Sequence, residues 1–295
     1  MKQGLECRAG GHAIGVIVEQ AMGLCAEDCP ISARIHPTGL HRELKRIDTF
    51  PGKCSHSWEY KDPHSFHGKK VVVIGTGDSS GDIAVEISRV AEKTFLSVRE
   101  GAWVVGRMSA GGLPLDMNIV THLNALLLQV FPPALLNWAV ERSYNQKYNH
   151  RLYGLQPRHR ILSQRPVIND DLPGHILQGV LQVTPNVREF RGSTVVFDNE
   201  AVEEGIDAVV FCTGYKASFP FLLPSQNSDP VGKVSLYKRV FPLSLERPTL
   251  AFIGLINAKG PLMPVMEMQA RWATRVFAGI TEQEKKDANI LTKST

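Results

Sequence analysis

The chain has 295 residues, of which 43% are hydrophobic and 21% charged, and its formal net charge is +4. These values are typical of a soluble globular protein with one large or two modest domains, which can bury a core without disulfide bonds. Basic residues are scattered through segments that also carry acidic residues and form no Lys/Arg block. This pattern favours anionic small molecules or an anionic membrane surface as partners and predicts no nucleic-acid binding.

The cysteines and the N-terminal segment indicate an intracellular protein. Five cysteines without the spacing of a disulfide framework predict reduced thiols. Cys25 and Cys29 form a lone C-x3-C with no second pair, so we interpret them as incidental thiols and predict no metal site. Residues 1–17 lack the apolar run of a secretory signal.

The first predicted elements alternate between strand and helix. Residues 1–38 have no sustained periodicity and are left unassigned. Lys69–Ile74 is predicted as a strand, Ser79–Ala91 as a helix and Thr94–Val98 as a second strand. A strand, a glycine-rich turn, a helix and a strand within about thirty residues form the unit that builds parallel sheets. The predicted fold class is therefore α/β, with a Rossmann-like FAD/NAD(P)-binding architecture.

A helical, aromatic insertion is predicted from Arg107 to Gln164. Its most apolar stretch, Asn118–Val140, contains polar residues and the pair Pro132-Pro133. Because a membrane-spanning helix needs about 20 uninterrupted apolar residues, we predict no transmembrane segment. Two short helices remain, either packed in the core or lying on a membrane surface. We favour the core, since apolar helix faces usually contact protein.

Strands return after the insertion. The predicted strands are Ser193–Phe197, Ala208–Cys212, Lys233–Val240 and Thr249–Ile256, and an amphipathic helix follows at Val265–Ala278. The predicted divisions are an unassigned segment (1–38), the first part of an NADP-binding Rossmann unit (39–106), the helical insertion (107–165), the second part of the NADP-binding domain (166–215), a remnant of an FAD domain (216–280) and a polar tail (281–295).

The stretch VVVIGTGDSSGD, residues 71–82, is a candidate phosphate-binding loop. A strand that turns through glycines into a helix presents free N–H groups and the positive end of the helix dipole to an anion. Gly75 permits the tight turn and Gly77 lets a phosphate approach the backbone, whereas Ser80 occupies the third glycine position, with Gly81 one residue later. The alternative is a glycine-rich turn without a ligand.

Two charged residues modify this prediction. The carboxylate of Asp78 is expected to repel a pyrophosphate. Arg99 ends the second strand 24 residues after Gly75 (99 − 75), where an NAD site usually has an acid and an NADP site an arginine. We predict that Arg99 clamps the 2′-phosphate of NADP with Arg107 as a second cation, the alternative being a surface arginine.

Upstream of the loop, the pattern F-x-G-x-x-x-H-x-x-x-Y is formed by Phe50, Gly52, His56 and Tyr60. Together with SVREGAWVVGR, YNHRLYGLQPRHRILSQRPVINDDLP, FCTGY, ERPTLAFIGLI and MQARWATRVFAG, it resembles the fingerprint of vertebrate flavin-containing monooxygenases, of the dimethylaniline monooxygenase type. The resemblance runs from about Leu40 to about Ile280.

This resemblance implies an enzyme that binds FAD and NADP(H) on separate Rossmann-type domains. In the family, NADPH reduces the flavin, dioxygen forms a flavin hydroperoxide, and one oxygen atom passes to a soft nitrogen or sulfur nucleophile or, in some members, to a ketone. It implies no catalytic triad, because the oxidant forms before the substrate arrives. It also implies the cytoplasmic face of the endoplasmic reticulum membrane as the location.

The resemblance also implies the roles of individual residues. Thr213 and Gly214 match a strand-ending turn near the cofactor, Cys212 before them is expected to be buried and inert, and His56 is interpreted as an architectural linker residue. The residues predicted to bind cofactor are Gly75, Gly77, Ser79, Ser80, Gly81, Asp82, Arg99, Arg107, Thr213 and Gly214.

One departure from the family pattern leaves two functions open. Family members begin with their own FAD loop far upstream of the NADP loop, and only 74 residues precede Gly75 here. We therefore expect a chain truncated at both ends with an incomplete FAD site, and a strand Thr249–Ile256 without its sheet neighbours. The chain is then either a monooxygenase or an inactive NADP-binding fragment of one. A simple dehydrogenase is disfavoured, because Tyr215-Lys216 has no further support.

Overall fold

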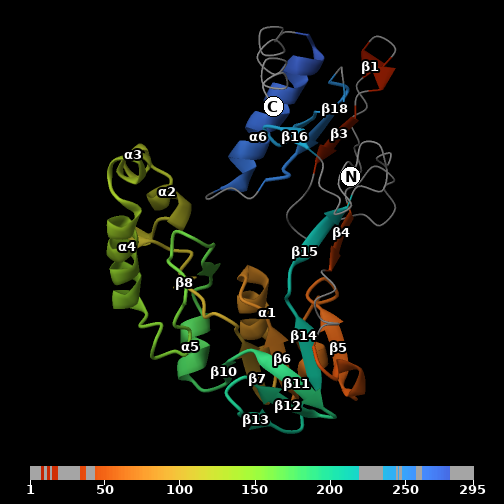
Figure 1. Cartoon of the computed structure of the whole chain (residues 1–295), viewed down its shortest axis with the longest axis vertical. Coiled ribbons are helices and arrows are strands. Elements are labelled where there is room, and N and C mark those ends of the chain that lie inside the picture. The colour runs from red at the N-terminus through yellow and green to blue at the C-terminus, as the bar shows by residue number, and fades with distance from the viewer. Residues whose placement is uncertain are drawn as a thin grey trace. The chain divides into compact units, whose positions relative to one another are not determined.

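A computed structural model describes residues 44–218, 235–243, 245, 248–256 and 261–279, and the strands found between residues 8 and 37. For residues 216–218 and for the strands before residue 38, it describes the backbone alone. The chain forms two compact units (Figure 1), one of Pro37–Tyr215 and one of Met1–His36 with Lys216–Thr295. The domain boundaries given above stay predictions.

A five-stranded sheet forms the centre of the unit Pro37–Tyr215, in the order β10-β7-β6-β14-β5. Its strands are β5 (Lys53–His56), β6 (Lys70–Ile74), β7 (Lys93–Ser97), β10 (Leu181–Thr184) and β14 (Ala208–Phe211). All four neighbouring pairs are parallel. The predicted α/β class and the predicted strands at the start of the unit are confirmed.

The sheet is buried on both faces. Val71 and Val73 of β6 belong to one hydrophobic cluster, and Val72 of the same strand belongs to another on the opposite face. Side chains alternate between the faces of a strand, so a strand covered on both sides needs an unbroken apolar run. The run VVVI in β6 therefore follows from the position of this strand in the sheet.

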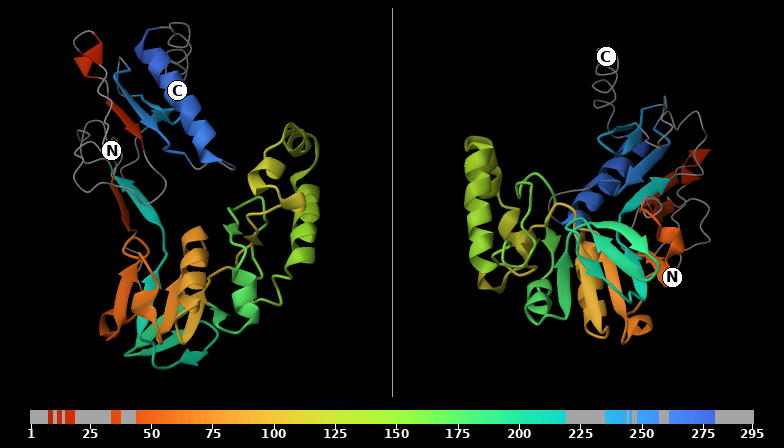
Figure 2. Two further views of the ribbon diagram at one scale, coloured as in Figure 1. Left: turned by 180° about the vertical axis from the view of Figure 1, so that it is seen from behind. Right: turned by 60° about the horizontal axis from the view of Figure 1, so that its bottom comes forward.

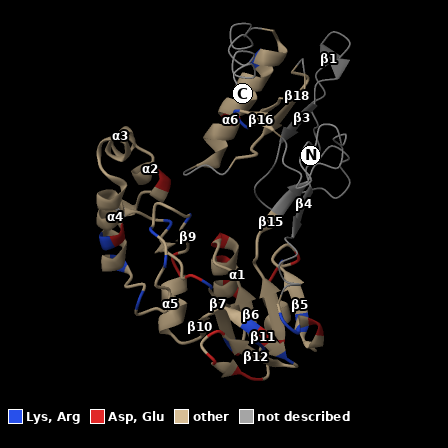
Figure 3. Cartoon of the chain, in the orientation of Figure 1, with Lys and Arg blue, Asp and Glu red and all other residues tan. Residues whose placement is uncertain are grey.

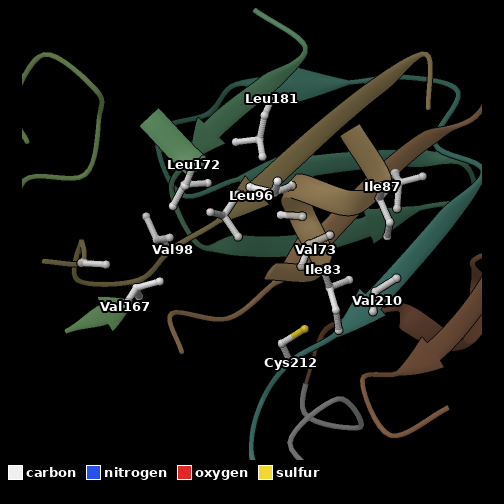
Figure 4. Packing of buried hydrophobic residues seen from close by; sticks show 14 of the residues in the cluster. Val73, Ile83, Ile87, Leu96, Val98, Val167, Leu172, Leu181, Val210 and Cys212 are labelled. Carbon is white, nitrogen blue, oxygen red and sulfur yellow. The ribbon is translucent and has the colours of Figure 1, made fainter. Parts of the chain in front are cut away.

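Helices α1 (Asp78–Ser88) and α5 (Leu172–Leu177) contribute to the cluster on the first face. In Figure 4, Ile83 and Ile87 of α1 lie among side chains of the sheet strands. The helix ends three residues before the predicted Ala91. The chain turns there, and the carbonyl of Val90 accepts a hydrogen bond from Gly68 N at 3.0 Å.

An antiparallel sheet covers the second face. It consists of β11 (Val187–Arg191), β12 (Thr194–Phe197) and β13 (Val202–Glu203). Phe190 and Phe197 are fully buried and pack in the same cluster as Phe95 of the central sheet. The predicted strand at Ser193–Phe197 is confirmed as β12. Strands β10 and β11 and helix α5 were not predicted.

The insertion is helical only in its first part. Its elements are η4 (Ala110–Gly112), α2 (Leu115–Ile119), α3 (His122–Val130) and α4 (Pro133–Lys147). The helix break at Pro132-Pro133 is confirmed, with Pro133 as the first residue of α4. Residues 148–165 form turns, so the predicted helical extent is too long.

The two ends of the insertion are held together by a parallel pairing. Strand β8 (Val104–Val105) pairs with β9 (Val167–Ile168). Helices α2, α3 and α4 stand together beside the sheet (Figure 2). No residue of α2 or α3 is buried. The expectation that the two apolar helices pack in the core is therefore wrong for α3, whereas Val140 of α4 packs against the buried cluster of Trp103, Val105 and Ile161.

Short strands and one long helix make up the described part of the other unit. The strands are β1 (Arg8–Ala9), β2 (His12–Ala13), β3 (Gly15–Val18), β4 (Arg34–Pro37), β15 (Tyr215–Ser218), β16 (Leu236–Tyr237), β17 (Phe241–Pro242) and β18 (Leu250–Ile253), and the helix is α6 (Leu262–Phe277). Besides η4, the unit Pro37–Tyr215 contains the 3-10 helices η2 (Ile47–Thr49) and η3 (His64–Phe66).

Three expectations for this unit need correction. Strand β18 has sheet neighbours, because β3 pairs with it in parallel and Phe252 N donates to the carbonyl of Val240 at 2.7 Å. Among its described residues, 235–240, the predicted strand Lys233–Val240 is a strand only at β16, because Lys238 and Arg239 have positive φ angles and form a turn. Helix α6 begins three residues before the predicted Val265, directly after Pro261. The predicted polar tail lies outside the described residues.

Candidate functional site

The loop between β6 and α1 is shaped by Gly75. Its φ angle is +149°, and a Cβ atom at this position would lie 2.5 Å from the carbonyl oxygen of Cys212. Gly75 N donates to the carbonyl of Ser97 at 3.2 Å, which ties the loop to the end of β7. Only glycine fits this close contact between the loop and the end of β14.

The second glycine opens the loop toward the helix. Gly77 is the N-cap of α1, and a Cβ atom there would meet no heavy atom within 4 Å. No described residue accepts a hydrogen bond from the N–H groups of residues 76–79. Open space beside free amides at a helix N-terminus is an anion-binding arrangement. Ser79, in the first turn, is exposed.

The role of the third glycine is divided between two residues. Ser80 is buried, and its Oγ donates to the carbonyl of Gly77 at 2.6 Å. A Cβ atom at Gly81 would lie 2.8 Å from Cγ1 of Val167 in β9. Close helix packing, which the third glycine usually serves, therefore falls to Gly81, and its partner is the strand after the insertion.

The carboxylate of Asp78 has partners on β9. Its Oδ1 accepts a hydrogen bond from Ile168 N at 2.9 Å, and its Oδ2 lies 3.6 Å from Nε of Arg165. A carboxylate that accepts from a backbone amide and faces an arginine carries a partly compensated charge. The expected repulsion between Asp78 and a pyrophosphate is weakened accordingly.

The strand register explains where Arg99, Thr213 and Gly214 lie. Ile74 pairs with Ser97 and with Phe211, so the chain after each strand leaves at the same edge of the sheet. Arg99 follows β7 at this edge, and Thr213 and Gly214 follow β14. Arg99 is exposed and forms no hydrogen bond or ion pair with the described residues. Ligands of open parallel sheets bind at this edge.

Arg107, the predicted second cation, is already paired. Its Nη2 lies 2.8 Å and 3.0 Å from the two carboxylate oxygens of Asp82. The hydrogen bond to Asp82 raises the pKa of Arg107, and Asp82 also accepts from Asn169 Nδ2 at 2.7 Å. The structure thus connects Arg107 to the second turn of α1, and its contact with a 2′-phosphate stays a prediction.

The fingerprint residues Phe50 and Gly52 hold the start of β5. Phe50 is buried, with its ring 5.4 Å from that of Phe190. A Cβ atom at Gly52 would lie 2.3 Å from the carbonyl oxygen of Asp207, so β5 approaches β14 at a point where only glycine fits.

His56 and Tyr60 also make architectural contacts. The buried His56 accepts a hydrogen bond from Trp58 N at its Nδ1 (3.1 Å), and its ring packs edge-on against Tyr215. Tyr60 donates to Oε2 of Glu86 in α1 at 2.9 Å, and burial, together with this bond, raises its pKa. These contacts agree with the architectural interpretation of His56, whose role stays a prediction.

Sequence reasoning missed the residues after β9. Asn169 is buried and contacts Asp82, and Asp170 accepts a hydrogen bond from Arg107 N at 3.0 Å. The only signal in the sequence was a polar run directly after an apolar pair. Cys212, expected to be inert, is buried, and burial raises the pKa of its thiol to about 12.

In the described ranges, no group of three or more His, Cys, Asp or Glu side chains is arranged to hold a metal ion. None of the helices in the described part of the chain is long and apolar enough to cross a membrane.

Comparison with known proteins places this geometry in a family. A family model described as flavin-binding monooxygenase-like matches residues 34–293. Mouse flavin-containing monooxygenase 5 is 47% identical over 248 residues, which cover 83% of this chain and 46% of that protein. Rat dimethylaniline monooxygenase [N-oxide-forming] 2 is 46% identical over the same coverage. The chain therefore spans about half the length of the curated relatives it matches.

Solved structures share the fold. Cyclohexanone monooxygenase from Rhodococcus sp. Phi1, bound to NADP+, aligns with a TM-score of 0.59 and 17% identity over 88% of this chain and 62% of that one. A flavin-containing monooxygenase from Stenotrophomonas maltophilia aligns with a TM-score of 0.51 and 18% identity over 83% and 59%. The family match covers most of the sequence, and the chain belongs to the flavin-binding monooxygenase-like family.

Proposed function

We propose that this chain functions as a flavin-containing monooxygenase that uses NADPH and dioxygen to oxygenate soft nitrogen or sulfur nucleophiles. The observation that carries the proposal is the open loop at Gly77, with the free N–H groups of residues 76–79 at the start of α1. Family membership and the name of the rat relative, an N-oxide-forming dimethylaniline monooxygenase, support the reaction class.

The residues at the loop fit one dinucleotide. The amides at the start of α1 would hold the pyrophosphate, Gly75 keeps the loop close to β14, and Arg99 would bind the 2′-phosphate. A bound flavin would supply the activation of dioxygen. The task of these residues is to bind and orient NADPH and to hold the loop against the sheet.

The first experiment is a visible absorbance spectrum of the purified chain with and without added FAD, followed by titration with NADPH. A bound flavin that NADPH bleaches, with N-oxide formed from N,N-dimethylaniline in air, supports the proposal. Binding of NADPH without bound flavin would favour the alternative of an inactive NADP-binding chain. Absence of NADPH binding would contradict both.

Arg99→Ala tests the choice between NADPH and NADH. Loss of one hydrogen bond to a charged group is expected to raise the dissociation constant for NADPH about tenfold and leave that for NADH unchanged. Arg89→Ala serves as the control, because Arg89 lies at the far end of α1 in an exposed pair with Asp171. Equal weakening of both cofactors, measured by fluorescence titration, would exclude a 2′-phosphate clamp.

We also propose that α2 and α3 bind the surface of a membrane, as expected for an enzyme on the cytoplasmic face of the endoplasmic reticulum. Neither helix buries a residue, and α3 carries no Lys, Arg, Asp or Glu (Figure 3). The exposed apolar side chains of this segment are Met117, Ile119, Val120, Leu123, Leu126, Leu128 and Val130. Exposed apolar side chains gathered on neighbouring helices mark a contact with protein or lipid.

The double variant Leu123→Glu/Leu126→Glu tests this surface. The two leucines lie three residues apart on α3 and are 64% and 55% exposed, so the variant is expected to fold normally. Sedimentation with phosphatidylcholine and phosphatidylserine vesicles should fall to background. Leu177→Glu, at a 73% exposed leucine of α5, is the control and should leave vesicle binding intact. Undiminished sedimentation of the double variant would reject the membrane role.

A further inference from the structure

The turn between β9 and α5 is hydrogen-bonded to the second turn of α1. Asn169 is 2% exposed, and its Nδ2 donates to Oδ1 of Asp82 at 2.7 Å. Asp82 also accepts from Nη2 of Arg107, whose backbone N–H donates to Asp170. The buried amide of Asn169 thus supports the ion pair between Arg107 and Asp82. This ion pair links the start of the insertion to the candidate phosphate-binding helix.

The orientation of the Asn169 side chain is fixed from its other end. Its Oδ1 accepts hydrogen bonds from Asp171 N at 2.9 Å and from Leu172 N at 2.7 Å, at the start of α5. The backbone N–H of Asn169 donates to the carbonyl of Val105 in β8 at 2.9 Å. An amide supplies an acceptor to α5 and a donor to Asp82 at the same time, whereas a carboxylate supplies acceptors only.

Three positions of α1 share this contact with β9 and the turn after it. Asp78 accepts from Ile168 N, Gly81 packs against Val167, and Asp82 accepts from Asn169. Residues at i, i+3 and i+4 lie on one face of a helix. Both carboxylates in the first turns of α1 are therefore engaged by partners that follow the insertion in the chain.

We propose that Asn169 is a positioning residue for the dinucleotide loop. It keeps Asp82 and Arg107 paired and holds the first turn of α1 against β9, so that the N–H groups of residues 76–79 face the phosphates. This role rests on the proposed binding of NADPH to the loop. The affinity for a dinucleotide would then depend on the contacts that join the two ends of the insertion to α1. The effect would be the same for NADPH and NADH, because it does not involve the 2′-phosphate.

Asn169→Asp tests the role directly. The new carboxylate keeps the acceptor for α5 but loses the donor to Asp82 and adds a like charge beside it. The dissociation constants for NADPH and NADH should both rise by the same factor of about ten or more. The double variant Asn169→Asp/Asp82→Asn restores one donor and one acceptor across the contact, and it should recover most of the lost affinity for both cofactors.

Asp82→Ala gives a second test, in which the direction of the change in cofactor affinity distinguishes two roles of Asp82. If Asp82 were only a negative charge near the phosphates, its removal would tighten binding; if it serves the positioning contact, its removal weakens binding of both cofactors equally. This variant decides the question should Asn169→Asp fail to fold, as judged by circular dichroism. Unchanged or tighter binding in Asp82→Ala would overturn the proposal, whereas a native chain that does not bind NADPH would instead refute the proposed function.

Discussion

Gly75→Ala is expected to lower the free energy of unfolding by about 2–5 kcal/mol. The new Cβ atom would lie 2.5 Å from the carbonyl oxygen of Cys212. The φ angle at this position is +149°, which residues other than glycine rarely adopt. The obstacle is backbone at the end of a central strand, so it cannot rotate away as a side chain would. Either the loop leaves the sheet or β14 shifts, and we expect the proposed dinucleotide site to be lost in both cases.

Gly77→Ala is the matched control for this prediction. Its φ angle of −103° suits any residue, and its Cβ atom would meet nothing within 4 Å. Stability should stay within about 0.5 kcal/mol of the native value. NADPH affinity should nevertheless fall about a hundredfold, because the methyl group occupies the space where the phosphate approaches the backbone. Urea unfolding and NADPH titration of both variants, in parallel, separate the two roles; a fully stable Gly75→Ala chain would show that the close contact with Cys212 is unimportant.

The sequence was most informative where local pattern and burial coincide. The segment from β6 through α1 to β7 was predicted because a parallel strand buried on both faces reads as an apolar run and the turn carries glycines. Strands β10 and β11 were missed. Polar residues such as Gln182, Arg188 and Glu189 interrupt their apolar pattern.

The effect of Asp78 could not be inferred from neighbouring residues. Its partner Ile168 lies 90 positions away in the sequence, and only the fold brings the two together. The same holds for Asn169, which belongs to no motif and acquires its contacts with Asp82 through the pairing of β8 with β9. Periodicity showed that α3 has an apolar face, but it carries no information about what covers that face.

The end of the insertion is fixed by a buried histidine. His150 is 1% exposed, its Nε2 accepts from Val104 N at 2.9 Å, and its Nδ1 lies 2.8 Å from Oδ1 of Asn145. Its ring packs edge-on against Trp103. These contacts require the neutral ring with the proton on Nδ1, so that Nε2 is free to accept. His150 thus joins the chain after α4 to β8.

His150→Ala is expected to cost about 2–4 kcal/mol, because it opens a cavity and leaves the buried Val104 N–H without its acceptor. His150→Gln is the milder variant, since its amide offers both an acceptor and a donor. Comparison of the two by urea unfolding at pH 8 separates the loss of the hydrogen bonds from the loss of the ring. Equal stability of the native chain and His150→Ala would show that the contact does not hold the insertion.

The same residue gives the fold a dependence on pH with a defined sign. Burial lowers the pKa of His150 below its ordinary value of 6.5. At a pH between the folded pKa and 6.5, the unfolded chain therefore binds a proton that the folded chain does not. The stabilisation is complete above pH 6.5 and is lost as the pH falls toward the folded pKa.

Burial also lowers the pKa of His175, whose Nδ1 lies 2.7 Å from Oγ of Ser88. Urea unfolding between pH 8 and 5.5 should therefore show a smaller loss of stability in His150→Gln than in the native chain, and a smaller one still when His175→Gln is added. An unchanged slope in His150→Gln would mean that the ring becomes protonated without breaking its bond to Val104.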